Sequence, residues 1–400
     1  MLVCEKGRVA GEQSGRNWGW VRQQGRSPIE LPLMMESLRL WQGFTRELGE
    51  DIGFTQGGCL YLADNPKDFE AFGNWLPNAS AVGLDTRLLS SRELSTVLKG
   101  DVSRWAGGMY TQSDGRAEPS RAVPGIARAA SRAGARIVSN CAVRGIERAA
   151  GRTQAVVTEH GVVNASSVVC AGGAWTSLFC ASLDIAVPQL RVKGTVARTA
   201  PAAVVLNGEA WCPHVAIRRR WDGGYTVAHG SALHHSLVPA TLRFATKFFP
   251  AFMQEHGAIR LRIGRDFLQA LKTPRRWPLD KESPFERERM LDPAPDEGVL
   301  AEMRAGLDRW FPEMGAPAFV ESWGGMIESS PDVLPMLSPV AGLEGFFIAT
   351  GFSGHGFGIG PGAGQLVADM VTNRASAAAL APVRLSRFFD GSPIRPGPTI

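Results

Sequence analysis

A run of closely spaced glycines near the C-terminal end constrains the fold more than any other feature of the sequence. The segment GFFIATGFSGHGFGIGPGAGQLVADMV, residues 345–371, starts as an apolar stretch typical of a buried strand and leads into a helix expected from Gly362 to Thr372. Glycines let backbone N–H groups and a helix N-terminus approach a flat or anionic ligand closely. We therefore predict a loop that faces a cofactor. A plain tight turn is the alternative, because glycine runs are common in turns.

Within this run, Gly358, Gly360 and Ala363 match the GxGxxA pattern of a dinucleotide-binding turn. The context does not fit that pattern, since one helix and a tail follow, without a second strand or an acidic residue about 20 positions on to hold a ribose. A nicotinamide-dependent dehydrogenase needs the complete strand-helix-strand unit. The sequence therefore argues against that class of enzyme.

The rest of the chain alternates between strand-like and helix-like patterns. We expect the following elements: the end of a strand at 2–4, an amphipathic helix at 30–50, a strand at 59–62, a helix at 120–133, a strand at 136–138, an antiparallel meander at 142–163 and a buried strand that ends in glycines at 167–175. From about Pro188 to Phe319, strand-like pieces mix with longer helical and loop segments. These patterns predict an α/β fold with a second domain inserted into the first.

Composition excludes several classes of protein. The formal charge is only +5, with 43 Lys and Arg against 38 Asp and Glu, and the scattered basic residues argue against a nucleic-acid surface. The six cysteines show no CxxC pair and no histidine at metal spacing, so we expect neither a disulfide framework nor a metal site. No stretch approaches the roughly 20 apolar residues of a membrane span, and the start lacks a signal-peptide core. We expect a soluble cytoplasmic protein, with peripheral membrane contact left open.

Seven segments follow one another in a fixed order: EKGRVAGEQSGRNWGWVRQQGR, GGCLYLA, SDGRAEP, GARIVSNCAVRGIE, VVCAGGAWT, WGGMIESSPDVLPMLSPV and the glycine-rich segment at 345–371. Together they resemble the D-amino-acid oxidase-like family of flavoproteins, which includes D-amino-acid dehydrogenases, glycine oxidase and the sarcosine oxidases. The resemblance implies a two-domain FAD-dependent oxidoreductase fold. Its expected parts are a Rossmann-like FAD-binding domain at 1–70, 115–185 and 325–375, a mainly antiparallel substrate-binding domain at 71–114 and 186–324, and a C-terminal tail at 376–400.

The resemblance also implies which residues hold FAD. Glu5 would bind the adenosine ribose, and Val143 would meet the adenine through its backbone. Further contacts would come from Ser14, Gly15, Arg16 and Asn17 at the pyrophosphate and flavin edge, from Ala171, Gly172 and Gly173 under the cofactor, and from Gly354, Gly356, Gly358 and Gly360 at the isoalloxazine. The helix from Gly362 would point its positive end at the ring.

Two departures from the family pattern affect these expectations. The family opens with a strand and a GxGxxG turn before the Glu-Lys-Gly strand, so we expect the first βα unit to be missing here. At Gly324–Ile327, the family places either an arginine for the substrate carboxylate or a cysteine that bonds the flavin, and neither residue is present. We therefore expect non-covalent FAD and a carboxylate partner elsewhere.

An amino-acid carboxylate in a dry pocket needs a cation, preferably a bidentate arginine. The candidates are Arg22, Arg26, Arg218 and Arg220, each with a surface or structural role as the alternative. Trp18 and Trp20 share one face of an extended segment and would form an aromatic pocket wall or ordinary core packing. His355 would tune the flavin or contact the substrate, and its titration would then give the activity a pH dependence near its ordinary pKa of about 6.5. The alternative is that His355 only forms structural hydrogen bonds within the loop.

The predicted activity is oxidation of the C–N bond of a D-amino acid or an N-alkyl amino acid. A hydride would leave the substrate Cα for the flavin, and water would hydrolyse the imine to a 2-oxo acid. We predict His355, Arg22 and Trp20 as catalytic residues, and O2 or an electron-transfer acceptor as the oxidant, with a dehydrogenase slightly preferred. The alternative is a truncated, catalytically silent relative that serves as a binding or partner subunit.

Overall fold

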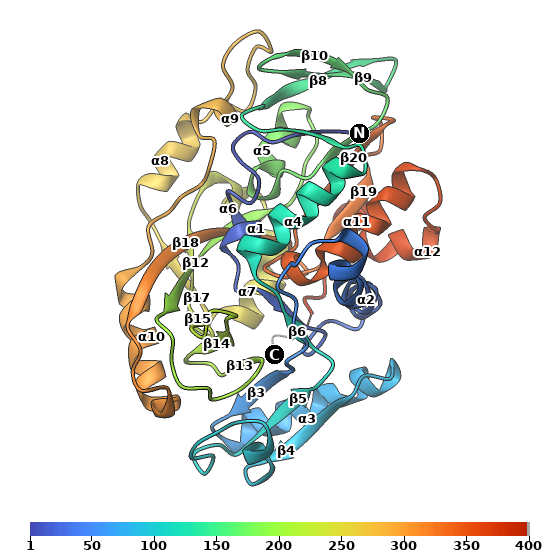
Figure 1. Cartoon of the computed structure of the whole chain (residues 1–400). Helices are drawn as coiled ribbons and strands as arrows, with labels where there is room; N and C mark the ends of the chain where they lie inside the picture. The colour runs from blue at the N-terminus through green and yellow to red at the C-terminus, as the bar shows by residue number, and fades with distance from the viewer. Residues whose placement is uncertain (398–400) are drawn as a thin grey trace.

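A ten-stranded, mostly antiparallel sheet forms one half of the protein. The computed structural model describes residues 1–397, apart from the side chain of Arg265. In Figure 1 the strands of this sheet run down the left side to the bottom of the view, whereas α2 (Leu31–Leu48) and α11 (Gly356–Val371) lie on the right. The strands are β3 (Cys59–Ala63), β4 (Thr86–Ser90), β5 (Gly107–Thr111), β12 (Leu190–Thr199), β13 (Glu209–Trp211), β14 (Ala216–Arg219), β15 (Tyr225–Ala228), β16 (Leu233–Ser236), β17 (Ile259–Arg262) and β18 (Phe319–Ser329).

The two faces of this sheet have different partners. Leu60 and Leu62 of β3 point to a core shared with α10 (Glu297–Trp310), which covers one face. Cys59 and Tyr61 point the opposite way and pack with Trp20 from the N-terminal region. Because side chains alternate along a strand, polar residues in register with Cys59 also face the N-terminal half.

The other half contains short parallel strands. β1 (Leu2–Cys4) pairs with β7 (Arg136–Val138), and β11 (Val168–Cys170) pairs with β20 (Phe346–Thr350), both in parallel. β19 (Met336–Pro339) is antiparallel to β20. The expected meander is confirmed as β8 (Val143–Ala149), β9 (Arg152–Thr158) and β10 (Gly161–Asn164), at the top of Figure 1. The mixed α/β architecture is thus the predicted one, whereas the absence of a first βα unit stays a prediction.

The remaining elements connect or cover these sheets. They are α1 (Gln13–Arg16), β2 (Trp20–Val21), α3 (Pro66–Ala81), β6 (Gly115–Arg116), α4 (Pro119–Arg132), α5 (Thr176–Ser182), α6 (Pro239–Arg243), α7 (Ala245–Glu255), α8 (Arg265–Lys272), α9 (Pro284–Arg287) and α12 (Ala377–Leu380), with 3-10 turns at Glu93–Thr96, Gly173–Trp175, Pro312–Met314, Ala381–Val383 and Leu385–Phe388. Although β3 falls within 1–70, it belongs to the ten-stranded sheet. The domain boundaries stay a prediction.

The glycine-rich helix begins at Gly356, six residues before the predicted start at Gly362. Glycine normally weakens a helix, but here it permits close contact with α2. The carbonyl oxygen of Gly358 accepts hydrogen bonds from Ser37 Oγ at 2.6 Å and Trp41 Nε1 at 2.9 Å. A Cβ atom on Gly362 would lie 2.6 Å from the carbonyl oxygen of Leu33. The predicted start was wrong because part of the glycine run serves helix packing rather than a loop.

The segment expected as a tail packs onto the protein as far as it is described; residues 398–400 lie outside the described part. Leu385 and Phe388 are buried beside Phe346 of β20. Arg387 makes a buried bidentate ion pair with Asp332, at 2.7 and 2.9 Å. These contacts fix the C-terminal segment to the half that contains the parallel strands.

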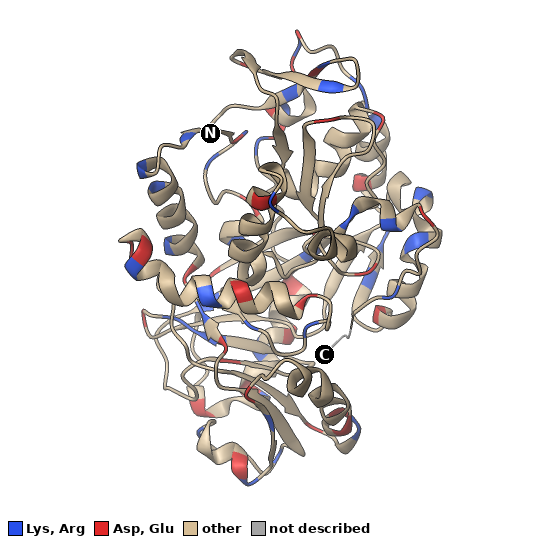
Figure 2. Ribbon diagram, turned by 90° about the vertical axis from the view of Figure 1, so that its right-hand side faces the viewer, with Lys and Arg blue, Asp and Glu red and all other residues tan. Residues whose placement is uncertain are grey.

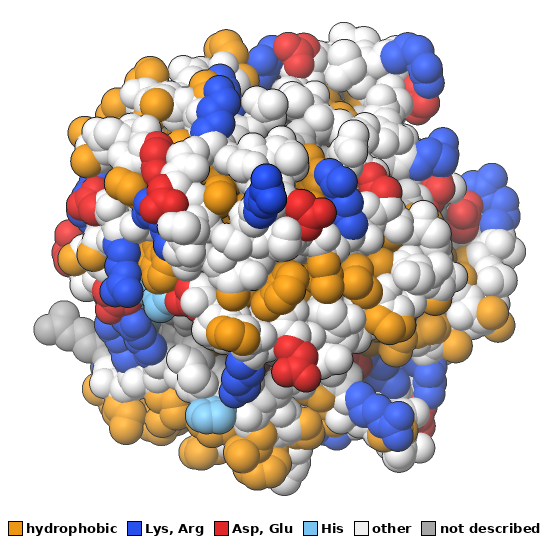
Figure 3. All heavy atoms as spheres, turned by 90° about the horizontal axis from the view of Figure 1, so that it is seen from below, with side chains coloured by type: hydrophobic (Ala, Val, Ile, Leu, Met, Phe, Trp, Pro, Cys, Tyr) orange, Lys and Arg blue, Asp and Glu red, His pale blue; other side chains and the backbone are white. Residues whose placement is uncertain are grey.

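Lys and Arg are interspersed with Asp and Glu on the faces seen in Figures 2 and 3. Among residues 1–397, every helix is too short or too polar to cross a bilayer.

Candidate functional site

The loops that follow β1, β11 and β20 meet at one place. Lys6, just after β1, places its ammonium 4.4 Å from the ring centre of Trp175, which follows β11. At the end of β20, Thr350 Oγ1 donates to the carbonyl oxygen of Gly173 at 3.3 Å. Ligands of open α/β sheets bind outside the carboxyl ends of the strands, so this is the expected position for a cofactor.

Glu5 directly follows β1, and only one of its two carboxylate oxygens accepts a hydrogen bond from a described residue. Its Oε1 accepts a hydrogen bond from Gly7 N at 2.7 Å, and burial raises the pKa of the carboxyl. Within the described residues, no hydrogen bond reaches Oε2. An oxygen without a partner at the end of the first strand fits a ribose hydroxyl as its donor.

Glycines on the other two loops leave backbone exposed. Gly173 has φ +52°, and a Cβ atom there would meet nothing within 4 Å. Gly354 has φ +86°, with only Ile327 Cγ2 at 3.9 Å from a Cβ position, and Gly360 is equally open. Ala171 and Gly172 are exposed. Positive φ at Gly173 and Gly354 favours glycine, and the bare surface fits a flat ring system such as that of FAD.

The first turn of α11 adds a positive end to the site. The N–H groups of Gly356, Phe357 and Gly358 precede the first intrahelical hydrogen bond, and the N-cap residue His355 provides no side-chain cap. A helix of 16 residues carries partial positive charge at this end. The groups present therefore fit a cofactor that carries negative charge when reduced.

Arg16 and Asn17 shape the loop rather than project from it. Arg16 Nη1 donates to Asp292 at 2.7 Å and to the carbonyl oxygen of Gly324 at 3.1 Å. The Asn17 amide donates to Ser14 O at 2.6 Å and accepts from Gly19 N at 2.8 Å. Cofactor contacts of Ser14, Arg16 and Asn17 stay predictions. Val143 begins β8, two residues after Cys141, whose N–H donates to Glu5 O at 2.9 Å, so its predicted adenine contact lies near the same strand end.

His355 is half-buried and lies beside Glu30, the N-cap residue of α2, and Arg26 in the segment before that helix. Its Nδ1 lies 3.0 and 3.1 Å from the carboxylate oxygens of Glu30. Burial and the nearby Arg26 lower the pKa of His355 to about 4. Burial alone would raise the pKa of Glu30, but His355 and Arg26 offset it and lower that pKa. This pKa lies below the ordinary value of about 6.5 that we expected for His355, because the ring is largely withdrawn from water and lies beside a cation.

Arg22 is the best placed of the four arginine candidates. Its guanidinium lies 5.3 Å from the ring centre of Tyr61 and 5.9 Å from that of Trp20, and it donates to Gln24 O. Burial alone would lower the pKa of Arg22, but Tyr61 and the acidic groups around it raise that pKa. The side chain is half-buried and charged, as a carboxylate partner requires.

The other arginine candidates differ in what occupies their donors. Arg218 is buried and donates to Glu118 at 2.8 Å, to Thr226 at 2.9 Å and to the carbonyl oxygen of Trp18. Arg220 pairs with Asp222 at 2.7 Å. Arg26 keeps a buried Nη1 without a hydrogen-bond partner, and burial lowers its pKa to about 10. The geometry therefore favours Arg22 and Arg26 over Arg218 and Arg220.

Two acidic residues near the site, Glu30 and Glu328, were not predicted from the sequence. Glu30 was hidden in the polar part of the amphipathic pattern at 30–50. Glu328 follows the positions 324–327 that we searched for an arginine or a cysteine. Burial raises the pKa of Glu328 to about 7. Its carbonyl oxygen accepts from Ser353 N at 3.0 Å, next to the glycine loop. The sequence shows that position 328 is a glutamate, but it does not show that this side chain is buried.

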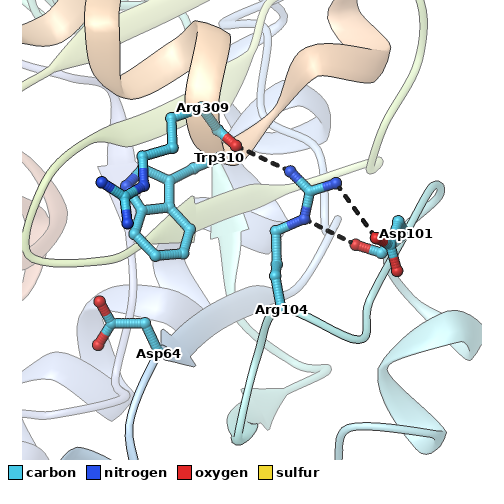
Figure 4. Close-up of a pocket in the computed structure, with 5 residues that line it drawn as sticks. All are labelled: Asp64, Asp101, Arg104, Arg309 and Trp310. Carbon is cyan, nitrogen blue, oxygen red and sulfur yellow. Dashed lines mark hydrogen bonds and ion pairs between the residues drawn. The ribbon is translucent and has the colours of Figure 1, made fainter.

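A surface cavity of about 460 Å³ lies elsewhere, lined by Asp64, Asp101, Arg104, Arg309 and Trp310 (Figure 4). Arg104 donates to Arg309 O at 2.8 Å and to Asp101 O at 3.1 Å, so its guanidinium is used structurally. Trp310 belongs to the core on the α10 face of the ten-stranded sheet, whereas Trp20 and Tyr61 belong to the opposite face. No predicted site residue lines this cavity.

The strand ends, bare glycines and helix terminus are those of a nucleotide-cofactor oxidoreductase, and comparison with known proteins defines the family. A family model described as FAD dependent oxidoreductase matches residues 1–370, and the chain belongs to this family. The family, the fold class and FAD as the family's cofactor are thereby confirmed.

Individual relatives differ in name and in length. Sarcosine oxidase subunit beta from Arthrobacter sp is 23% identical over 98% of this chain and 85% of that protein. Human mitochondrial sarcosine dehydrogenase is 24% identical over 92% of this chain but only 36% of that protein. Among solved structures, L-amino acid deaminase from Proteus myxofaciens in complex with anthranilate has a TM-score of 0.92 at 31% identity, covering 97% of this chain and 88% of that one.

Proposed function

We propose that this protein binds FAD non-covalently at the loops after β1, β11 and β20 and oxidises the C–N bond of an amino acid or an N-alkyl amino acid. FAD, when bound, supplies the acceptor for the hydride that leaves the substrate Cα. Loss of that hydride and of the amine proton gives an imine, which water hydrolyses to a 2-oxo acid and ammonia or an amine. The substrate class is supported by the relatives named for sarcosine and for amino acids.

The observation that carries the proposal is the charged, half-buried Arg22 against Trp20 and Tyr61. Its guanidinium would hold the substrate carboxylate, and the two rings would exclude water from that ion pair. A neutral His355 would donate from Nδ1 to Glu30, and its Nε2 would then accept a hydrogen bond from the substrate N–H and orient it. Trp20 would form the pocket wall beside the substrate. These residues bind and orient the substrate, while the redox chemistry belongs to the cofactor.

The test is an absorption spectrum of the purified protein, followed by anaerobic titration with sarcosine and with both enantiomers of several amino acids. We expect flavin bands that at least one of these compounds bleaches. In Arg22→Gln the bands should persist, while the substrate concentration for half-maximal bleaching rises by about 100-fold, as expected for loss of a charged hydrogen-bonded pair.

Arg220→Gln is the matched control, because Arg220 pairs with Asp222 near the surface and should leave bleaching unchanged. A protein without flavin bands, or with bands that none of these compounds bleaches, would contradict the proposal. The preference for D-amino acids is decided by the two enantiomers, and the oxidant by comparing O2 consumption with reduction of an artificial acceptor.

A further inference from the structure

Exposed apolar side chains gather in one part of the chain. Eight of the large apolar side chains exposed within residues 1–397 belong to the stretch that includes α6, α7, β17 and α8: Leu242, Phe249, Phe252, Met253, Leu261, Ile263, Leu268 and Leu271. Leu242 is 73% exposed and Ile263 is 83% exposed. Scattered single apolar residues are normal on a surface, but such a concentration marks an interaction surface.

The same stretch contains more basic than acidic residues. Residues 239–276 contain eight Lys and Arg against two Asp and Glu, a formal charge of +6, whereas the whole chain carries +5. Arg243, Lys272 and Arg275 are exposed, and none of them forms an ion pair with a described residue. Of the two acidic residues, Asp266 accepts a hydrogen bond from Ser236 Oγ at 2.5 Å, and burial raises the pKa of Glu255. Arg260, Arg262 and Arg276 pair with Glu302, Asp296 and Asp184, which lie outside the stretch. Arg243, Lys272 and Arg275 are therefore the exposed cations that remain for a partner.

The stretch leaves the ten-stranded sheet at its edge and returns to it. The chain departs after β16, forms α6 and α7, and pairs again as β17 beside β16. It then continues into α8, which lies on the left in Figure 1. No described side chain of α6 or α8 is buried, and Ala251 is the buried residue of α7. The outward faces of these short helices thus lack a partner within the described residues.

Leu268 and Leu271 show how α8 presents this surface. They are three positions apart, so they lie on one face of the helix, and each is 59% exposed. The neighbouring Phe267 and Ala270 are half-buried on the side toward the protein. The C-terminal Lys272 is exposed beside the two leucines. A helix with leucines outward and a lysine at their margin suits an interface between water and acyl chains.

We infer that residues 239–276 bind the surface of an anionic phospholipid bilayer. Lipid phosphates would neutralise Arg243, Lys272 and Arg275, while the exposed leucines and phenylalanines enter the headgroup boundary. A second copy of the chain is disfavoured as the occupant, because Arg243, Lys272 and Arg275 of the two copies would repel one another. The short helices would lie on the bilayer surface rather than cross it.

The experiment is co-sedimentation of the full chain with vesicles of phosphatidylglycerol and phosphatidylcholine, compared with vesicles of phosphatidylcholine alone. We expect at least tenfold stronger binding to the anionic vesicles, and weaker binding as salt is added. The double variant L268S/L271S should bind at least tenfold more weakly, since it loses two inserted side chains. The triple variant R243Q/K272Q/R275Q should show a similar loss.

The control is V162S/V320S, which removes two comparably exposed apolar side chains, at 56% and 57%, outside the stretch. This control should bind vesicles as strongly as the original protein does. All variants should have the melting temperature of the original protein, because the altered side chains are exposed. Equal binding to both kinds of vesicle, no binding to either, or undiminished binding of L268S/L271S would overturn the inference. Self-association that L268S/L271S abolishes would do so too, since the surface would then join copies of the chain.

Discussion

Glu328 is a carboxyl that burial holds near neutrality, with a pKa raised to about 7. A group whose pKa is higher in the folded than in the unfolded protein favours folding at low pH. That contribution is lost as the pH rises from its ordinary value of 4.5 through about 7. Since each unit of pKa difference corresponds to about 1.4 kcal/mol, the folded state loses on the order of 3 kcal/mol over this range.

Glu328→Gln should therefore change stability in a pH-dependent way. The amide mimics the protonated acid and cannot ionise, so the variant should melt close to the original protein at pH 5 and on the order of 3 °C above it at pH 8. The measurement is the melting temperature of both proteins between pH 5 and pH 8. A constant difference across this range would mean that Glu328 does not titrate there. Glu313→Gln serves as the control, because Glu313 is exposed and its substitution removes no buried charge.

The contact between α2 and α11 depends on glycine at the element scale. A Cβ atom at Gly362 would lie 2.6 Å from Leu33 O and 3.1 Å from Ser37 Cβ, whereas one at Gly364 would meet nothing within 4 Å. Gly362→Ala should destabilise the protein by about 1–3 kcal/mol, because the two helices must move apart. Gly364→Ala should be neutral or stabilising by about 0.5–1 kcal/mol, because alanine is the better helix former. Thermal melting of the two variants checks the order, and similar losses in both would contradict the close packing.

Much of the fold could be predicted at the level of elements, because periodicity is a local property. The helix at 30–50, the helix and strand at 120–138 and the meander at 142–163 all appear close to their expected positions. The start of α11 could not be predicted, since whether Gly358 lines a loop or packs against Ser37 depends on a helix more than 300 residues away in sequence.

The site was predictable in kind but not in its electrostatics. From residue type alone, Arg22 and Arg218 are equally suitable cations for a carboxylate. Only the fold shows that Arg218 already pairs with Glu118, whereas Arg22 lies against aromatic rings. The lowered pKa of His355 likewise results from burial and from Arg26, neither of which can be read from the glycine-rich segment itself.

At the scale of the whole molecule, Arg218 joins the ten-stranded sheet to the other half. It extends from β14, donates to Trp18 O in the N-terminal segment and pairs with Glu118, the N-cap residue of α4. Both side chains of the ion pair are only 1% exposed. Removing the arginine would leave a buried carboxylate whose remaining partners are Trp221 N at 3.0 Å and the Arg116 guanidinium at 3.8 Å.

Arg218→Met should therefore destabilise the protein by about 3–5 kcal/mol, as expected when one partner of a buried ion pair is lost. The double variant E118Q/R218M should recover part of this loss, because it also removes the buried carboxylate, which Arg116 at 3.8 Å compensates only in part. Arg220→Met, which affects a pair nearer the surface, should cost less than about 1 kcal/mol. The melting temperatures of these variants rank them by stability and so check the prediction. If Arg218→Met and Arg220→Met had the same melting temperature, the buried ion pair would contribute no more to stability than a surface pair. Apolar packing would then hold the two halves together.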